Sequence, residues 1–266
     1  MTRQVYIATV LAEQDAYRAA APASLPRAVR ALAQPVAALT QRLIPPEAVE
    51  MALMAADWAA ATSIRKAAIG HDFSDLEACD GAATDIRRWA LGYAATGGGA
   101  AGALGIAGLA VDVPATITLA LRTARLTGLS YGFGGEGTAE RVFILDTLEL
   151  AGANSAEEKR AALERLSADR TDLPAESWGR IVKLTGQSAG AQAAAKRVAQ
   201  ALGANLSLRK VGQLTPLVGA AIGASVNAAF QNDVARAAQH AYRERWLAVN
   251  EGLVRGELTG PGDKSA

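Results

Sequence analysis

His240 is the first residue of this chain to consider for chemistry, because an imidazole can act as a general base near neutral pH. It lies in the segment AQHAYRERW at 238–246, and the acids that could orient it are Asp112 and Glu140. No serine or cysteine nucleophile can be matched to His240 from the sequence. The sequence therefore leans away from an enzyme, and a packing or hydrogen-bonding role is the alternative for His240.

Asp112 is the most unusual acid, because it stands inside an apolar stretch. A buried aspartate is costly unless it is paired or caps a helix. Pro114 follows two residues later, and proline is favoured in the first turn of a helix. We predict that Asp112 caps a helix beginning at Pro114, with Arg122 as the alternative ion partner.

Six potential metal ligands crowd ten residues of the chain: His71, Asp72, Asp75, Glu77, Cys79 and Asp80. Their spacing matches no zinc or calcium loop. The residues 74–77 also have the S-x-x-E pattern of a capping box, which gives Glu77 a structural task at the start of a helix. We predict no metal at this cluster. A second capping box, at 155–158, predicts a short charged helix that ends near Asp169.

Two glycine patterns match G-x-G-x-x-G, one at Gly97, Gly99 and Gly102 and the other at Gly132, Gly134 and Gly137. A dinucleotide site needs this pattern between a strand and a helix, with an acid about 20 residues later. Neither pattern follows a believable strand, and Asp112 comes too soon after the first. We therefore predict helix packing at the first pattern, a flexible loop at the second, and no cofactor.

The chain as a whole predicts an all-α fold. Half of its 266 residues are apolar and only 5% are aromatic, and alternating β-branched runs are nearly absent. A convincing helix runs over 47–69, where Val49 and Leu53 begin an apolar stripe. We predict a multi-helix bundle that forms one domain at 1–255, followed by a disordered glycine- and proline-rich tail at 256–266.

Two long segments, 89–111 and 211–232, contain no charged residue. Each carries two glycines four residues apart, a spacing that lets helix backbones approach closely: Gly98, Gly102, Gly219 and Gly223. Length alone allows a membrane span, but glycine and alanine contribute little transfer free energy. We predict two central Gly/Ala-rich apolar helices packed closely against each other. Spanning of a bilayer and reversible insertion are the alternatives.

The distribution of charge suggests a membrane partner rather than a nucleic acid. With 27 basic and 26 acidic residues, the chain has no excess charge that would attract nucleic acid. Between 177 and 232, however, all charged residues are basic: Arg180, Lys183, Lys196, Arg197, Arg209 and Lys210. A heptad frame buries Ala195, Val198 and Leu202 and places several of these bases outward. Such a stripe suits an anionic lipid surface, at roughly 1 kcal/mol per residue; a solvated face balanced by the acidic segment before it is the alternative.

The N-terminus and the cysteine content bear on location. The apolar run at 5–12 is short for a signal peptide, and Glu13 and Asp15 separate it from alanines that look like a cleavage site. The single cysteine, Cys79, excludes an internal disulfide and is consistent with a reducing compartment. We expect a cytoplasmic protein, peripheral to the inner membrane.

Several segments, in their order along the chain, are similar to the EcsC family: the glycine-rich run entering Asp112-Val113-Pro114, then Leu121-Arg122, Tyr131-Gly132, ERVFIL at 140–145, PLVGAAIGA at 216–224 with Asn227, and HAYRER at 240–245. The similarity covers about 58–246. It implies a bacterial protein whose family is named for the third member of an operon that encodes an ABC transporter, and it implies no catalytic residue. The positions that match the family pattern are Asp112, Pro114, Arg122, Tyr131, Glu140, Arg141, Asn227, His240 and Arg245.

Three functions remain open from the sequence. The first is an accessory protein at a membrane surface, with anionic lipid or a component of an ABC transporter as its partner. The second is a soluble helical protein that binds an apolar ligand, such as a lipid chain, between its small-residue helices. The third is an enzyme that uses His240 with Asp112 or Glu140.

Overall fold

The computed structural model describes residues 2–22, 49, 53, 70–103, 106–133, 138–168, 189–210, 216–250, 252 and 254–255. These residues form helices α1 (Arg3–Ala19), α5 (Leu76–Ala103), α6 (Ile106–Ser130), α7 (Thr138–Gly152), α8 (Ala156–Ala168), α10 (Ala189–Lys210) and α11 (Pro216–Val249). No strand occurs among the residues that are described. The predicted all-α fold is confirmed.

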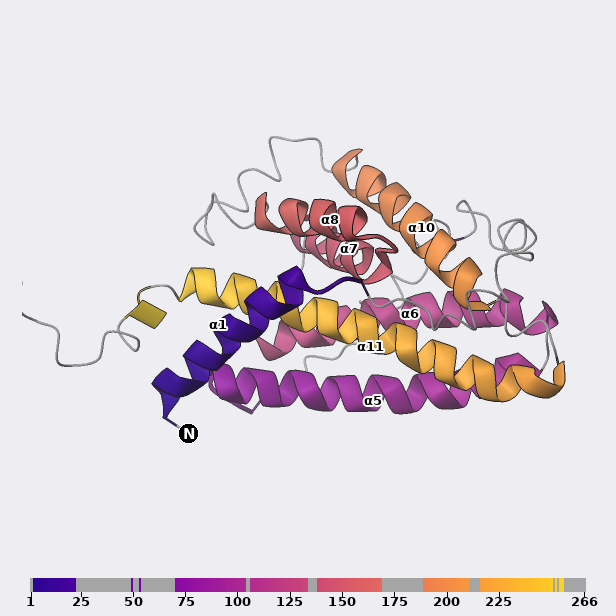
Figure 1. The fold of residues 1–266 in the computed structure, drawn as a ribbon, viewed down its shortest axis with the longest axis horizontal. Helices are drawn as coiled ribbons and strands as arrows, with labels where there is room; N and C mark the ends of the chain where they lie inside the picture. The colour runs from indigo at the N-terminus through magenta and orange to yellow at the C-terminus, as the bar shows by residue number, and fades with distance from the viewer. Residues whose placement is uncertain are drawn as a thin grey trace, which may run out of the picture.

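The longest helix, α11, lies along α5 for most of its length (Figure 1). The two helices are antiparallel, since Trp246 Nε1 donates to the carbonyl of Phe73 at 2.7 Å while Arg87 Nε donates to Asn232 Oδ1 at 2.9 Å. The charge-free second half of α5 and the charge-free start of α11 therefore meet at the same end of the bundle. The two segments thus lie on neighbouring helices, as predicted, but segment 89–111 is not one helix, because α5 ends at Ala103 and α6 begins at Ile106.

Helix α6 packs on α11 in the parallel direction. Asn227 Nδ2 donates to Asp112 Oδ1 at 2.9 Å, and one turn later Gln231 Nε2 donates to the carbonyl of Thr116 at 3.0 Å. Because α6 is one helix from Ile106 to Ser130, Pro114 lies inside it, and the predicted helix start at Pro114 is wrong. One of these hydrogen bonds lies before the proline and the other after it, so together they hold α6 against α11. This packing compensates for the backbone hydrogen bond that proline cannot make.

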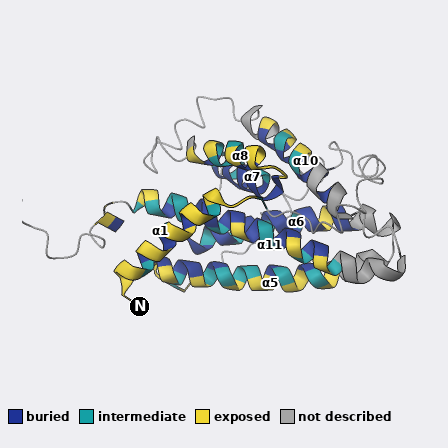
Figure 2. Ribbon diagram, viewed as in Figure 1, coloured by how far each residue is buried: buried dark blue, intermediate teal, exposed yellow. Residues whose placement is uncertain are grey.

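A second layer lies over α6 and α11. Helix α7 packs on both of them, and α8 and α10 pack on α7 (Figure 1). In Figure 2 the parts of the ribbon that are coloured as buried lie mainly where the helices of the two layers face each other. Phe143 and Leu148 of α7 belong to this buried core. Across the other face of α11 runs α1, which buries only three side chains: Ile7, Val10 and Gln14.

The local signals at the helix starts are partly confirmed. The first turn of α5 is capped by Asp75 rather than by Ser74, because the Asp75 carboxylate accepts the backbone N–H of Glu77 at 3.0 Å. The capping box at 74–77 is therefore wrong by one residue, and Glu77 has no part in it. At α8 the prediction holds: Ser155 Oγ accepts the N–H of Glu158 at 3.1 Å. This helix ends at Ala168, as its charged pattern predicts.

Two glycines at the end of α6 are required by geometry. Gly132 has φ of 82°, a left-handed conformation that L side chains rarely adopt, and its N–H donates to the carbonyl of Leu129 at 3.0 Å. A Cβ on Gly128 would lie 2.6 Å from the ring of Tyr242. Gly132 thus belongs to a helix C-cap, which explains the first glycine of the second G-x-G-x-x-G pattern.

Other predictions fall outside the described residues. They concern most of the helix at 47–69, the loop at 134–137 and the tail at 256–266. Of the helix at 47–69, only Val49 and Leu53 are described, and both are buried. The contacts at Gly98, Gly102, Gly219 and Gly223 lie outside them as well. Among the described helices, none combines the length and the hydropathy that a bilayer crossing requires.

Candidate functional site

The bundle encloses a cluster of ionic and polar side chains around Asp80 of α5. Its carboxylate accepts hydrogen bonds from Arg243 Nε at 2.6 Å, from Tyr6 at 2.5 Å and from the hydroxyl of Tyr131. Burial and the Asp80 charge raise the pKa of Tyr131 well above its usual value, so the Tyr131 hydroxyl keeps the proton that it donates to Asp80. Burial would lower the pKa of Arg243, but its bond to Asp80 outweighs that effect and raises it.

A second ionic cluster lies around Glu140, at the start of α7. Its carboxylate accepts Arg245 Nη1 at 2.6 Å and the hydroxyl of Tyr242 at 3.0 Å. The Arg245 guanidinium also lies 4.4 Å from the centroid of the Phe133 ring and 5.0 Å from that of Phe143. Glu140 and Arg245 are both family-pattern positions, and the structure brings them together as an ion pair that joins α7 to α11.

Asp112 and Asn227 form a third buried contact, described above, which joins α6 to α11. This contact replaces the predicted capping role of Asp112. Nor does Arg122 serve as its ion partner, because the Arg122 guanidinium lies over the ring of Trp89, 5.2 Å from its centroid. Pro114 is exposed on α6, and Arg141 is half-buried on α7.

The pairing of His240 with Asp112 or Glu140, which the sequence left open as an alternative, is not formed. Asn227, the partner of Asp112, precedes His240 by 13 residues of one helix, a separation of about 20 Å at 1.5 Å per residue. The carboxylate of Glu140 is bound to Tyr242 and Arg245 instead. His240 is buried and stacks on Tyr17 with ring centroids 4.3 Å apart.

Five of the six potential metal ligands at 71–80 have separate surroundings, and Glu77 takes no part in the helix cap. Asp72 and Asp75 accept backbone N–H groups, His71 Nε2 lies 2.8 Å from the carbonyl of Ser130, and Asp80 holds the cluster described above. Cys79 is buried, and burial raises the pKa of its thiol to about 12. Among the described residues, no group of three such side chains converges on a metal-sized site.

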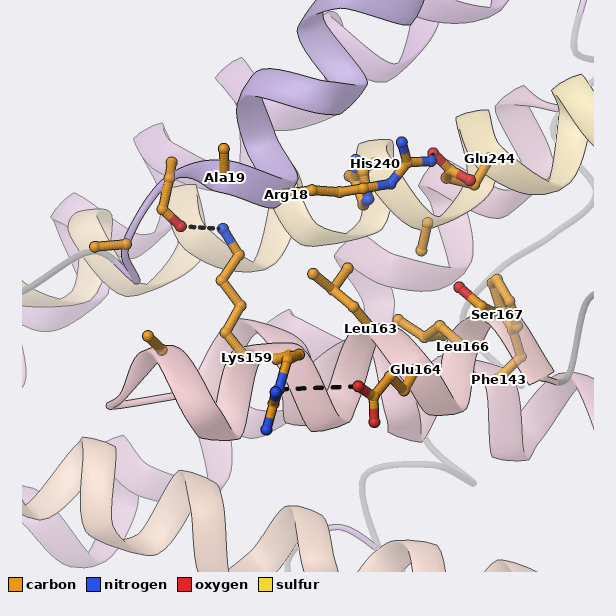
Figure 3. Close-up of a pocket in the computed structure, with 15 residues that line it drawn as sticks. Arg18, Ala19, Phe143, Lys159, Leu163, Glu164, Leu166, Ser167, His240 and Glu244 are labelled. Atoms are coloured by element: carbon orange, nitrogen blue, oxygen red, sulfur yellow. Dashed lines mark hydrogen bonds and ion pairs between the residues drawn. The ribbon is translucent and has the colours of Figure 1, made fainter.

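The described part of the chain contains a pocket of about 650 Å³ between the end of α1, α8 and α11 (Figure 3). This volume lies within the range of small-molecule sites. From α8, Lys159, Leu163 and Leu166 point toward α1 and α11, since they recur on one helical face. The remaining lining residues are Arg18, Ala19, Ala20, Ala21, Phe143, Ala156, Arg160, Glu164, Ser167, His240, Ala241 and Glu244.

Lys159 is the residue that distinguishes this pocket. Lys159 is only 6% exposed. Its ammonium donates to the carbonyl of Ala20 at 2.7 Å and to that of Tyr17. It also lies 4.2 Å from the centroid of the Tyr17 ring. No carboxylate of the described residues forms an ion pair with it. Burial lowers the pKa of Lys159, and the nearby charge of Arg236 lowers it further.

The other charges at the pocket are compensated. Arg18 pairs with Asp15 and Glu244, and Gln14 Nε2 donates to the same Glu244 at 3.1 Å. Arg160 lies 3.8 Å from Glu164 on the exposed side of α8. Among the described residues that line the pocket, Lys159 is therefore the cation whose charge no described carboxylate balances.

The structure describes the side chains of two of the six bases in the predicted stripe, Lys196 and Arg197. Arg197 is half-buried and pairs with Asp146 at 2.8 Å and with Glu149 at 3.3 Å, so its charge is balanced by the acidic segment before it, which was the alternative from the sequence. The frame is right for Ala195, Val198 and Leu202, which are buried. Lys196 is exposed. The other four bases lie outside the described side chains: Arg180, Lys183, Arg209 and Lys210.

The sequence did not reveal Asp80, Arg243 or Lys159 as central residues. Asp80 was one of six potential ligands near a helix start, and only its partners distinguish it: Tyr6, Tyr131, Gln239 and Arg243. The spacing of Lys159, Leu163 and Leu166 was a detectable signal, because it places a lysine on the apolar face of an otherwise charged helix.

These features define a class of protein: an all-α bundle with ionic clusters inside it and a mainly apolar pocket at its side. The chain belongs to the EcsC protein family, whose sequence profile matches residues 11–247. That range contains the region of about 58–246 that the motifs predicted, and it adds part of α1.

The chain is also similar to the "Uncharacterized protein YdbA" of Bacillus subtilis (strain 168), with 28% identity over 155 residues. The matched region is 56% of this chain and 50% of that relative, so the chain spans about half the length of the curated relative it matches. No solved structure matches the chain.

Proposed function

We propose that the protein binds an anionic amphiphile, a molecule with a carboxylate or phosphate head and a hydrocarbon chain, in the pocket between α1, α8 and α11. The observation that carries this proposal is the buried ammonium of Lys159 at the edge of a mainly apolar cavity. Its hydrogen-bond partners are carbonyl groups, and no carboxylate of the described residues pairs with it. It extends the apolar-ligand function considered from the sequence by adding a charge to the ligand.

The geometry at Lys159 supports an anionic head. An ammonium has three N–H donors, and the carbonyls of Tyr17 and Ala20 accept two of them. The third donor and the full positive charge are available to a ligand. A hydrogen bond between charged groups contributes about 1.5–3 kcal/mol. A carboxylate or phosphate would therefore bind here more strongly than a neutral hydroxyl.

The rest of the pocket supports a hydrocarbon chain. Leu163 and Leu166 of α8 and Phe143 of α7 line the cavity (Figure 3). Ala241 of α11 belongs to its lining as well. Each CH₂ group buried there would contribute about 0.8 kcal/mol. The alanines at the end of α1 leave this volume open because their side chains are short.

Isothermal titration calorimetry with three twelve-carbon ligands tests the proposal: dodecanoate, dodecyl phosphate and dodecanol, each below its aggregation limit. We expect dodecanoate or dodecyl phosphate to bind at least about tenfold more tightly than dodecanol, since 1.4 kcal/mol corresponds to tenfold. The comparison of the two anions shows which head group the site prefers.

Substitution at Lys159 makes the test specific. Lys159→Met keeps the length of the side chain and should remove the preference for the anions, while Lys159→Arg should retain most of it. Lys196→Met is the matched control, because Lys196 is an exposed lysine on α10 outside the pocket. Equal affinity of the unsubstituted protein for dodecanoate and dodecanol would refute the proposal.

The predicted link to an ABC transporter stays a prediction, because no described contact bears on it. Catalysis is not favoured by the site, since neither Asp112 nor Glu140 is available to His240.

A further inference from the structure

An exposed aromatic pair stands on the outer face of α5, away from the pocket. Trp89 is 42% exposed and Tyr93 is 60% exposed, and their rings stack with centroids 5.7 Å apart. The helix presents Gly92, Thr96 and Gly97 on the same exposed side. From Trp89 onward this face carries no charge, whereas Asp85 and Arg88 occupy it one turn earlier. We call these five residues, 89, 92, 93, 96 and 97, the α5 aromatic face.

The glycines of this face pack against no other part of the described structure. A Cβ built on Gly92 or Gly97 would meet no atom within 4 Å. Glycine in a helix interior costs about 0.5–1 kcal/mol relative to alanine. The two glycines instead leave the helix backbone accessible between the aromatic rings, so a broad neutral surface can approach α5 closely.

Arg122 of α6 adds a positive charge beside this face. Its guanidinium lies 5.2 Å from the centroid of the Trp89 ring. Its Nε is buried and has no hydrogen-bond partner among the described residues, and none of their carboxylates pairs with it. An anion at the edge of the Trp89 ring would give Arg122 the counter-charge that the described residues do not provide.

We propose that the α5 aromatic face docks on the interface of an anionic lipid bilayer, with Arg122 bound to a lipid phosphate. Tryptophan and tyrosine favour the level of the lipid head groups, where an apolar ring and a polar edge are both accommodated. The bilayer offers an apolar boundary to the neutral face and phosphates to Arg122 at once. This surface is different from the basic stripe predicted on α10.

Charge complementarity argues against a second copy of the chain as the occupant. The same face of another copy would bring a second Arg122, and the nearest acid on it, Asp85, is already paired with Arg88 at 2.9 Å.

The proposal does not rest on the pocket at Lys159, because the two sites share no residue.

Co-sedimentation of the full chain with vesicles tests the docking surface. Vesicles of phosphatidylcholine are compared with and without phosphatidylglycerol. We expect Trp89→Ser and Tyr93→Ser each to weaken binding about tenfold, which is about 1.4 kcal/mol. Arg122→Gln should remove most of the difference between anionic and neutral vesicles while leaving binding to neutral vesicles nearly unchanged.

The matched control is Val249→Ser, since Val249 is 68% exposed but lies at the far end of α11. Binding of dodecanoate and the far-ultraviolet circular dichroism of each variant report whether pocket and fold are intact. Vesicle binding that is absent, or equal in all four variants, would overturn the proposal. So would dimers in analytical ultracentrifugation that Tyr93→Ser dissociates without vesicles, because they would assign the face to a second copy.

Discussion

Asp80 and Lys159 are both buried charged residues, and their surroundings differ in one respect. The carboxylate of Asp80 meets a guanidinium and two hydroxyls, so its charge and its hydrogen-bonding capacity are both satisfied within the chain. The ammonium of Lys159 meets only carbonyl groups and an aromatic ring. A buried charge that is fully paired holds elements together, whereas one without a counter-charge is a cost that a ligand can relieve.

The location of the two residues agrees with this difference. Asp80 joins α1, α5, α11 and the end of α6 inside the bundle, and it is not among the residues that line the pocket at Lys159. Lys159 extends from α8 to the end of α1 along the wall of a cavity of about 650 Å³. The comparison therefore separates a structural cluster from the proposed binding site.

The largest effect is expected for Asp80→Asn. Removing this charge leaves the Arg243 guanidinium, 12% exposed at its side chain, without its closest carboxylate. Breaking a buried pair in this way costs about 3–5 kcal/mol, and urea unfolding should show a loss of that size. Asp85→Asn is the control, because its ion pair with Arg88 is exposed and should change stability by less than about 1 kcal/mol. Similar losses in both variants would show that Asp80 is not a structural centre.

Gly128→Ala should destabilise the Glu140 cluster. The added Cβ would lie 2.6 Å from the ring of Tyr242, which is fully buried and cannot move without weakening its hydrogen bond to Glu140. Overpacking of this kind costs about 1–3 kcal/mol. Gly81→Ala, at an open position of α5, should instead stabilise the protein, by up to about 1 kcal/mol. Thermal unfolding should show a lower midpoint for Gly128→Ala and a higher midpoint for Gly81→Ala than for the parent protein. A Gly128→Ala variant as stable as the parent would contradict the close contact between Gly128 and Tyr242.

Lys159→Met should change the stability of the free protein by less than about 1 kcal/mol at neutral pH, because the lost hydrogen bonds are offset by removal of an uncompensated buried charge. The pKa of Lys159 is lower in the folded state than in the unfolded state. The unfolded state therefore binds more protons, and the parent protein should gain stability relative to Lys159→Met as the pH rises through that lowered pKa. Urea unfolding between pH 7 and pH 10 measures this difference. If Lys159→Met lost as much unfolding free energy as Asp80→Asn, Lys159 would be a structural residue instead.

The sequence predicted what depends on local pattern, and it missed what depends on distant contacts. Helix content, the pairing of the two charge-free segments and the Ser155 cap follow from spacing and propensity along short stretches. Asp112 was predicted to be a cap because Pro114 follows it, but packing on α11 carries α6 through the proline. Tertiary contacts override local signals in such cases.

The candidate site was harder to predict for the same reason. Lys159 contacts carbonyls 139 and 142 residues away in the sequence, and no local pattern encodes such a meeting. Four of the family-pattern residues are neighbours in the structure, Asp112 with Asn227 and Glu140 with Arg245. Their roles came from the structure, since sequence spacing gave no reason to pair them.

Titration of the Lys159 ammonium by nuclear magnetic resonance tests the central claim most directly. The chain has six lysines, so the signal of Lys159 can be assigned with the Lys159→Met variant. In the free protein we expect a pKa below the 10.5 typical of lysine, and with dodecanoate bound we expect that pKa to rise, because the anion stabilises the charged form. A pKa of Lys159 that dodecanoate leaves unchanged would contradict the account.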